Sequence, residues 1–68
     1  IKMIKTVTED YDFARKLEDE TNFKIGFLDY LHIAISKRLD VLLITRDRDM
    51  IEIAKNHVKV KRPEELVN

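Results

Sequence analysis

The fold predicted for this chain depends mainly on residues Asp40–Met50, DVLLITRDRDM. Within it, Val41–Thr45 is a short, nearly all-apolar run, which is typical of a strand buried on both faces of a parallel sheet. The charged turn Arg46–Asp49 follows the run. Apolar residues then predict a short helix that ends near Asn56; they are Met50, Ile51, Ile53 and Ala54. The segment therefore predicts a strand followed directly by a helix.

A second strand is predicted after this helix, because Val58 and Val60 alternate with polar residues. Pro63 suits the first position of a terminal helical turn that runs through Val67. A strand, a helix and a second strand form a βαβ unit, whose strands are parallel. We therefore predict an α/β fold with a parallel sheet and helices packed on the sheet.

Two helices are predicted before the first strand. Thr8 is the expected N-cap of a helix over Glu9–Asn22, in which apolar residues recur at helical spacing. A second helix is predicted over Phe27–Arg38. Residues Phe23–Gly26 are predicted to connect the two helices, and Gly26 is the only residue of this connection that could adopt a positive φ angle without cost.

The apolar pattern also predicts which residues are buried. In the second helix one apolar arc is expected to face the core, with Asp29, His32 and Ser36 on the opposite side. The members of that arc are Phe27, Leu28, Leu31, Ala34 and Ile35. The most buried core residues are predicted to be Leu31, Ala34, Ile35, Leu42, Ile44, Ile53 and Val58. The aromatic residues Tyr11, Phe13, Phe23 and Phe27 are also interpreted as core.

Length and composition limit the class of protein. The chain has 68 residues, of which 44% are apolar and 38% charged, with 13 basic and 13 acidic side chains. A domain of this size buries only about 60% of the surface of its unfolded chain. The absence of cysteine excludes disulfides and thiolate zinc sites. The longest apolar run is too short to span a membrane, so the sequence predicts a soluble cytoplasmic protein. Abundant charge and the absence of glutamine are typical of heat-adapted proteins.

Carboxylates near the end of the first predicted strand are the candidate functional residues. Ligands of open parallel sheets bind beyond the carboxyl ends of the strands. Thr45 ends the run Val41–Thr45, and Asp47 and Asp49 follow it. Asp29 lies in the first turn of the preceding helix. Converging carboxylates favour Mg²⁺ or Mn²⁺, which prefer oxygen ligands.

Each of these residues also has a purely structural interpretation. Asp47, judged alone, is better explained as the N-cap of a helix that starts at Arg48, and Asp49 as a first-turn acid. His32 could bind a metal, but a partly buried histidine that donates a hydrogen bond is the favoured interpretation. The basic residues could contact phosphates or could only be solvated; they are Arg46, Arg48, Lys59, Lys61 and Arg62.

Three segments in this order resemble the C-terminal half of PIN-domain proteins: DYLHIAIS (Asp29–Ser36), DVLLITRDRDM (Asp40–Met50) and VKVKRPEEL (Val58–Leu66). The resemblance implies an incomplete PIN-like parallel sheet and Mg²⁺- or Mn²⁺-dependent hydrolysis of RNA. It implies that Asp29 and Asp47 are metal ligands and that Asp49 is a ligand or supports one. Thr45 would orient an aspartate or a water. Contacts to RNA would come from Arg46, Arg48 and Lys61. Many family members resemble toxins of toxin–antitoxin pairs, which implies an antitoxin partner.

The chain departs from the family pattern in its first part. No residue matches the family's first aspartate or its helical glutamate, and Glu9 and Asp10 are wrongly placed to replace them. The chain also opens with Ile1 instead of methionine. We therefore expect residues 1–68 to be one partial PIN-like domain that lacks its N-terminal segment and is a poor enzyme alone.

The competing hypothesis is a PIN-like half-domain that serves as a non-enzymatic oligomerisation or interaction module. Either way, two strands cannot cover their own edges and faces. We expect a homo-oligomer that buries over about 1,000 Å² in total, or association with the missing segment. The residues Ile1–Val7 are predicted to form an extended arm or short strand that could take part in this association.

Overall fold

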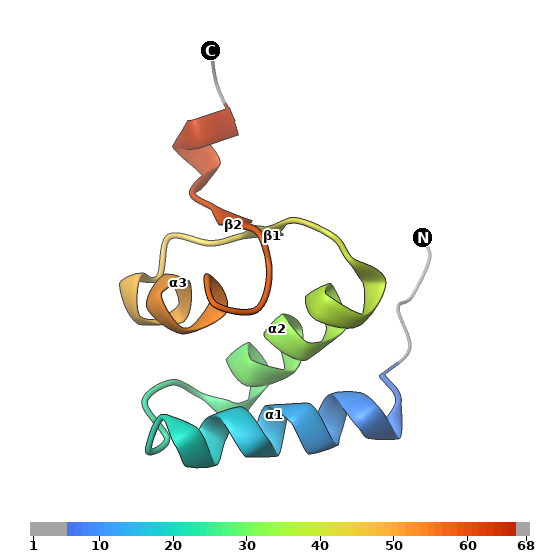
Figure 1. Ribbon diagram of the computed structural model, residues 1–68. Helices are drawn as coiled ribbons and strands as arrows, with labels where there is room; N and C mark the ends of the chain where they lie inside the picture. Colours follow the sequence, from blue (N-terminus) through green and yellow to red (C-terminus); the bar gives the residue numbers. More distant parts are fainter. Residues whose placement is uncertain (1–5, 67–68) are drawn as a thin grey trace.

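The computed structural model describes residues 6–66, in which three α-helices lie on one side of a small sheet (Figure 1). The elements follow the predicted order: α1 (Thr8–Glu20), α2 (Phe27–Leu39), β1 (Leu43–Ile44), α3 (Arg48–Ala54), β2 (Val60–Lys61) and the 3-10 turn η1 (Pro63–Leu66). β1 and β2 are parallel, with Leu43 opposite Val60 and Ile44 opposite Lys61. The predicted α/β fold with a βαβ unit is therefore confirmed. Of the predicted arm Ile1–Val7, residues 1–5 lie outside the described residues.

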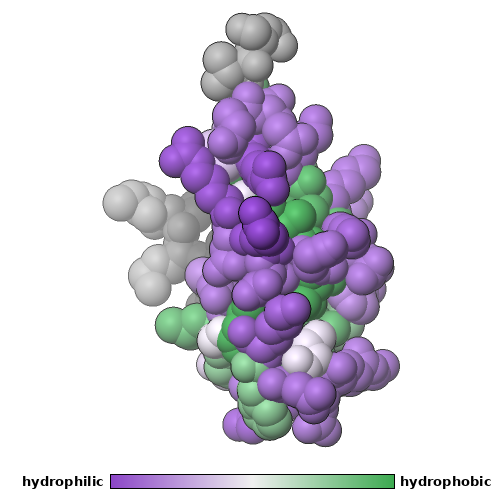
Figure 2. All heavy atoms as spheres, turned by 90° about the vertical axis from the view of Figure 1, so that its left-hand side faces the viewer, coloured by the Kyte–Doolittle hydropathy of each residue, from purple (hydrophilic) through white to green (hydrophobic). Residues whose placement is uncertain are grey.

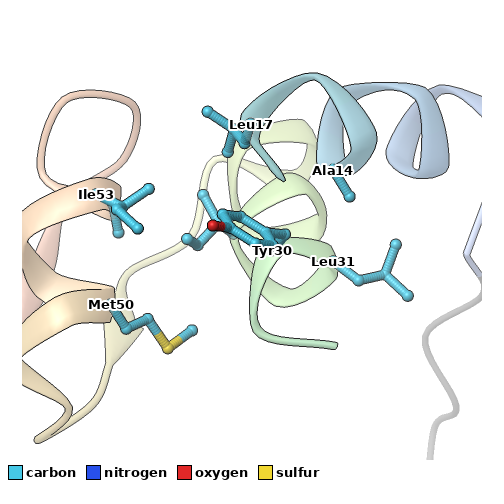
Figure 3. Packing of buried hydrophobic residues seen from close by; sticks show 8 residues of the cluster. Ala14, Leu17, Tyr30, Leu31, Met50 and Ile53 are labelled. Carbon is cyan, nitrogen blue, oxygen red and sulfur yellow. The ribbon is translucent and has the colours of Figure 1, made fainter. Parts of the chain in front are cut away.

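The core joins all three helices. Figure 1 shows α2 between α1 on one side and the β1–α3–β2 unit on the other. Figure 3 shows Met50 and Ile53 of α3 directed toward Tyr30 of α2, with Leu17 of α1 close to the same ring. One cluster contains these residues and four more: Ala14, Leu31, Ile33 and Ala54. The central helix thus supplies buried side chains to two neighbours.

The buried face of α2 differs from the predicted arc. Tyr30 and Ile33, which the arc omitted, are fully buried, whereas Leu28 is 68% exposed. Ser36, expected on the outer side, is buried. The prediction assumed that α2 packs against one neighbour along a single face. In the structure α2 packs against α1 on one side and against the β1–α3–β2 unit on the other, so a different set of its residues is buried.

The prediction that the first strand is buried on both faces is wrong. Val41 is 48% exposed, Leu42 39% and Ile44 46%, so Leu42 and Ile44 are not core residues. Leu43 and Val60 are partly buried against the helices, and the opposite face of the pair has no covering element among residues 6–66. The remaining core predictions are confirmed for Leu31, Ala34 and Ile53, while Ile35 and Val58 are only partly buried.

A buried carboxylate organises the start of α1. The N-cap is Val7, one residue before the predicted Thr8, and the Asp10 carboxylate accepts a hydrogen bond from Val7 N at 3.1 Å. Asp10 is only 2% exposed, and both of its oxygens contact Nε of Arg38, at 3.0 and 3.1 Å. This ion pair links the first turn of α1 to the last turn of α2.

Among residues 6–66, the residues with left-handed backbone conformations are not glycine. Gly26 has φ −69° as the N-cap of α2, so it does not use its freedom to adopt a positive φ angle. Among residues 6–66, Asn22, Phe23 and Asp40 have positive φ angles. Phe23 N donates to Glu18 O at 2.9 Å and Asn22 N to Asp19 O at 3.3 Å, which is the Schellman pattern of a helix C-terminus. Asn tolerates this conformation, but a bulky residue such as phenylalanine adopts it at a cost.

The aromatic residues are also less buried than expected. Phe13 and Phe27 pack partly against the core, whereas Tyr11 is exposed and Phe23 is 65% exposed. The prediction that Phe23 belongs to the core is therefore wrong. Within the described part of the chain, no helix is long and apolar enough to cross a membrane.

Candidate functional site

Asp47 is fixed at the carboxyl end of β1 by short-range hydrogen bonds. Its backbone N–H donates to Thr45 Oγ1 at 3.1 Å. Its Oδ1 accepts from Asp49 N at 2.9 Å and from Met50 N at 3.1 Å. The capping role of Asp47 is therefore confirmed, and the cap leaves Oδ2 without a hydrogen-bond partner among residues 6–66.

Asp29 occupies the first turn of α2. Its backbone N–H donates to Gly26 O at 3.0 Å, and the residue is half-buried. Oδ2 lies 4.0 Å from the position that a Cβ atom on residue 26 would take, so the carboxylate turns back toward the start of the helix. It accepts no hydrogen bond from the described residues.

The first turns of α2 and α3 share the same core. Tyr30 follows Asp29 directly, and Met50 lies three residues after Asp47; both side chains belong to the buried cluster (Figure 3). No hydrogen bond joins Asp29 to Asp47 within residues 6–66. The proximity of the two carboxylates to one cation therefore stays a prediction.

The α1–α2 connection lies against α3. Lys24 Nζ is 3.8 Å from Asp49 Oδ1. The hydrogen bond and charge of Lys55 lower the pKa of Glu52, and Lys24 adds a smaller effect in the same direction. Phe23, next to Lys24 in the sequence, is an exposed aromatic side chain of this connection.

Hydrogen bonds to the Tyr30 hydroxyl hold the α1–α2 connection in place. The Tyr30 hydroxyl contacts the Thr21 hydroxyl and accepts a hydrogen bond from Ile25 N at 3.4 Å. Thr21 Oγ1 in turn donates to Leu17 O at 2.8 Å. The segment that carries Phe23 is thus fixed at both ends by hydrogen bonds.

The carboxylates can be compared with the needs of a divalent cation. Across residues 6–66, no three or more His, Cys, Asp or Glu side chains lie close enough to hold a metal ion. Mg²⁺ usually binds one or two carboxylates and completes its shell with water and substrate phosphates. Asp29 and Asp47 are hard oxygen donors of the required type, so they fit part of such a shell but not a site built only from protein.

The basic residues predicted to contact nucleic acid surround the loop after β1. Arg46 Nε lies 3.5 Å from Glu64 Oε1 of η1. A backbone hydrogen bond lowers the pKa of Glu64, and the charges of Arg46 and Arg62 lower it further. Arg48 and Lys61 are exposed and form no ion pair with other described residues. Hydrophilic side chains dominate the face that carries α3, with a band of apolar atoms between them (Figure 2).

The histidines are not ligands of a common site. His32 is exposed and forms no hydrogen bond within the described part of the chain, so its interpretation as a partly buried donor is wrong. His57 is half-buried and packs edge-on against the ring of Phe13, with 5.3 Å between ring centroids.

Phe23 and Lys24 lie on the surface of this region. The prediction from sequence placed Phe23 in the core and assigned Lys24 no role. Asn22 was a usable signal, since asparagine is common just after a helix C-terminus and would place Phe23 outside α1.

Comparisons of the chain with models of known protein families, with curated proteins and with solved structures give no match. The resemblance to PIN domains, the toxin–antitoxin relationship and the roles assigned to Asp29, Asp47, Asp49 and Thr45 therefore stay predictions.

Proposed function

We propose that this chain supplies the Asp29 and Asp47 part of a PIN-like endoribonuclease site that uses Mg²⁺ or Mn²⁺. One observation carries the proposal: the Asp47 carboxylate is fixed at the carboxyl end of a parallel strand, and the preceding helix α2 carries Asp29 in its first turn. The order of these residues along the chain matches the family pattern quoted above.

Each residue has a defined part in this proposal. Asp47 uses Oδ1 to cap α3, which leaves Oδ2 available to a cation, and Thr45 Oγ1 accepts a hydrogen bond from the backbone of Asp47. The Asp29 carboxylate accepts no hydrogen bond from the described residues, so both of its oxygens are available to a cation. Asp49, held near Lys24, acts as a supporting charge. A cation bound to these oxygens would lower the pKa of a bound water and so supply the nucleophile for phosphodiester hydrolysis.

Manganese is expected to bind at the two helix starts. Titration with Mn²⁺, followed by NMR, should broaden the amide signals of Asp29 and of residues 47–50 before those of other residues. Asp47→Asn should weaken this broadening without unfolding the chain, because asparagine caps helices about as well as aspartate. The control is Asp12→Asn, which removes an exposed carboxylate of α1. Broadening centred on residues 18–20, the acidic end of α1, would contradict the proposal.

Phe23 is expected to contact single-stranded RNA. Stacking of a base on an aromatic ring contributes about 1–3 kcal/mol, so Phe23→Gly should weaken binding of a short oligoadenylate about tenfold. Glycine adopts a positive φ angle freely, so the same variant should be at least as resistant to heat as the parent. Fluorescence anisotropy and a thermal melt measure the two effects. Tyr11→Ala, which removes another exposed ring, serves as the control. Unchanged affinity in Phe23→Gly would exclude this contact.

A further inference from the structure

A small pocket lies between the end of α2 and the segments that lead into β1 and β2. Its volume is about 110 Å³, well below the roughly 300–1,000 Å³ of pockets that enclose drug-sized molecules. The polar residues that line it are Ser36, Lys37, Asp40, His57 and Lys59. The pocket is therefore at the amino ends of the two strands, whereas Asp47 follows the carboxyl end of β1.

Two polar groups of this pocket have no hydrogen-bond partner within residues 6–66. Ser36 is only 7% exposed; its carbonyl accepts from Val41 N at 3.0 Å, but its hydroxyl is bonded to no described residue. The backbone N–H of Lys59 likewise has no acceptor in that part of the chain. Because nearly all buried polar groups in proteins are hydrogen-bonded, a ligand with acceptor oxygens would complete this set of donors.

The charged side chains of the lining are predominantly basic. Lys37 and Lys59 form no ion pair with other described residues, and Asp40 is the one acidic residue of the lining. The ring of Phe13 holds two of the basic side chains on its surface. Lys37 Nζ lies 5.6 Å from the ring centroid, and the His57 ring packs edge-on against the same ring. The pocket thus combines cations with hydroxyl and amide donors, which is the chemistry that binds an oxyanion.

We propose that this pocket binds the terminal phosphate of a phosphate monoester. The ammonium groups of Lys37 and Lys59 neutralise the phosphate oxygens, and the Ser36 hydroxyl and an N–H of the His57 ring donate to them. The small volume admits the phosphate group and leaves the rest of the ester outside. A phosphodiester within a nucleic-acid strand carries a substituent on both sides and fits such a pocket less well.

Titration of the purified chain with inorganic phosphate, in a buffer with EDTA, tests the pocket. NMR is expected to show saturable shifts of the amide signals of residues 36–42 and 57–59. The double variant Lys37→Gln/Lys59→Gln should weaken binding at least about tenfold, because it removes both charge-assisted contacts. The matched control is Lys16→Gln/Lys24→Gln, which removes two lysine charges from exposed positions outside the pocket and should bind like the parent.

A variant of Asp40 tests the pocket with the opposite sign. Asp40 is the C-cap of α2 with φ 54°, a conformation that asparagine also adopts readily. Asp40→Asn therefore keeps the cap and removes the one negative charge of the lining, so phosphate should bind about twofold to fivefold more tightly. Asp12→Asn removes an exposed carboxylate of α1 and should leave the affinity unchanged. Equal affinities in the parent and Asp40→Asn would contradict the proposal.

Two short oligoadenylates, one with a 5′-phosphate and one with a 5′-hydroxyl, identify the source of the phosphate. Tighter binding of the phosphorylated strand, lost in Lys37→Gln/Lys59→Gln, would assign the pocket to the end of an RNA. Equal binding of the two strands, with inorganic phosphate still bound, would assign it to small phosphate esters. Shifts that do not saturate, or that persist in the lysine double variant, would show an adventitious ion only and overturn the proposal.

The pocket can be tested apart from the proposed nuclease function. Asp47→Asn removes a proposed metal ligand at the other end of the strands and should bind phosphate as the parent does in EDTA. Loss of manganese binding with retained phosphate binding would therefore reject the metal site alone, and the reverse result would reject the phosphate pocket alone.

Discussion

Ile33→Ala is expected to remove most of the folding stability of the chain. Ile33 is fully buried in the cluster that joins the three helices, and such truncations cost about 2–5 kcal/mol. A domain of this size rarely has more than about 3–5 kcal/mol to lose. A urea melt followed by circular dichroism should therefore show a largely unfolded variant at room temperature.

The matched control is Ile44→Ala, which deletes the same atoms from a residue that is nearly half exposed. We expect it to lower the free energy of unfolding by at most about 1 kcal/mol. Equal losses in the two variants would show that β1 is buried in solution, as the sequence alone predicted.

Asp10→Asn is expected to cause the second large loss, about 2–4 kcal/mol. The substitution keeps the size of the side chain but removes the buried negative charge of Asp10 that pairs with the Arg38 guanidinium. Breaking a buried ion pair usually costs about 3–5 kcal/mol. Arg38 is one-third exposed and regains some hydration, which reduces the cost.

Glu9→Gln is the control for this variant, since it removes one exposed negative charge from the same first turn of α1. Loss of its interaction with the helix dipole should cost only about 0.3–1 kcal/mol. The two thermal melts should therefore be clearly separated, and coincident melts would show that the Asp10–Arg38 pair does not stabilise the fold.

The order and type of the elements could be predicted because their causes lie close together in the sequence. Asp47 caps α3 through amides two and three residues away, and Pro63 begins η1. The apolar run before Thr45 favours extended backbone in any context. The same short range explains why the hydrogen bonds of Asp47 in the candidate site could be predicted.

The contacts that hold the candidate site together could not be predicted in this way. Asp10 and Arg38 are 28 residues apart, and the Lys24–Asp49 pair joins two segments that meet only after α2 packs on α3. The positive φ angle of Phe23 was also missed, because only glycine adopts such an angle without cost.

By itself the sequence determined a βαβ unit preceded by two helices, with Asp29 in the first turn of the second helix and Asp47 as the N-cap of the third. Only the tertiary structure decided which apolar residues are buried. Tyr30 and Ile33 are enclosed because α2 lies between two neighbours, whereas Leu42 and Ile44 stay exposed because the described elements cover only one face of β1. Hydrophobicity is a property of each side chain, but burial also requires a surface to pack against, and only the folded arrangement provides one.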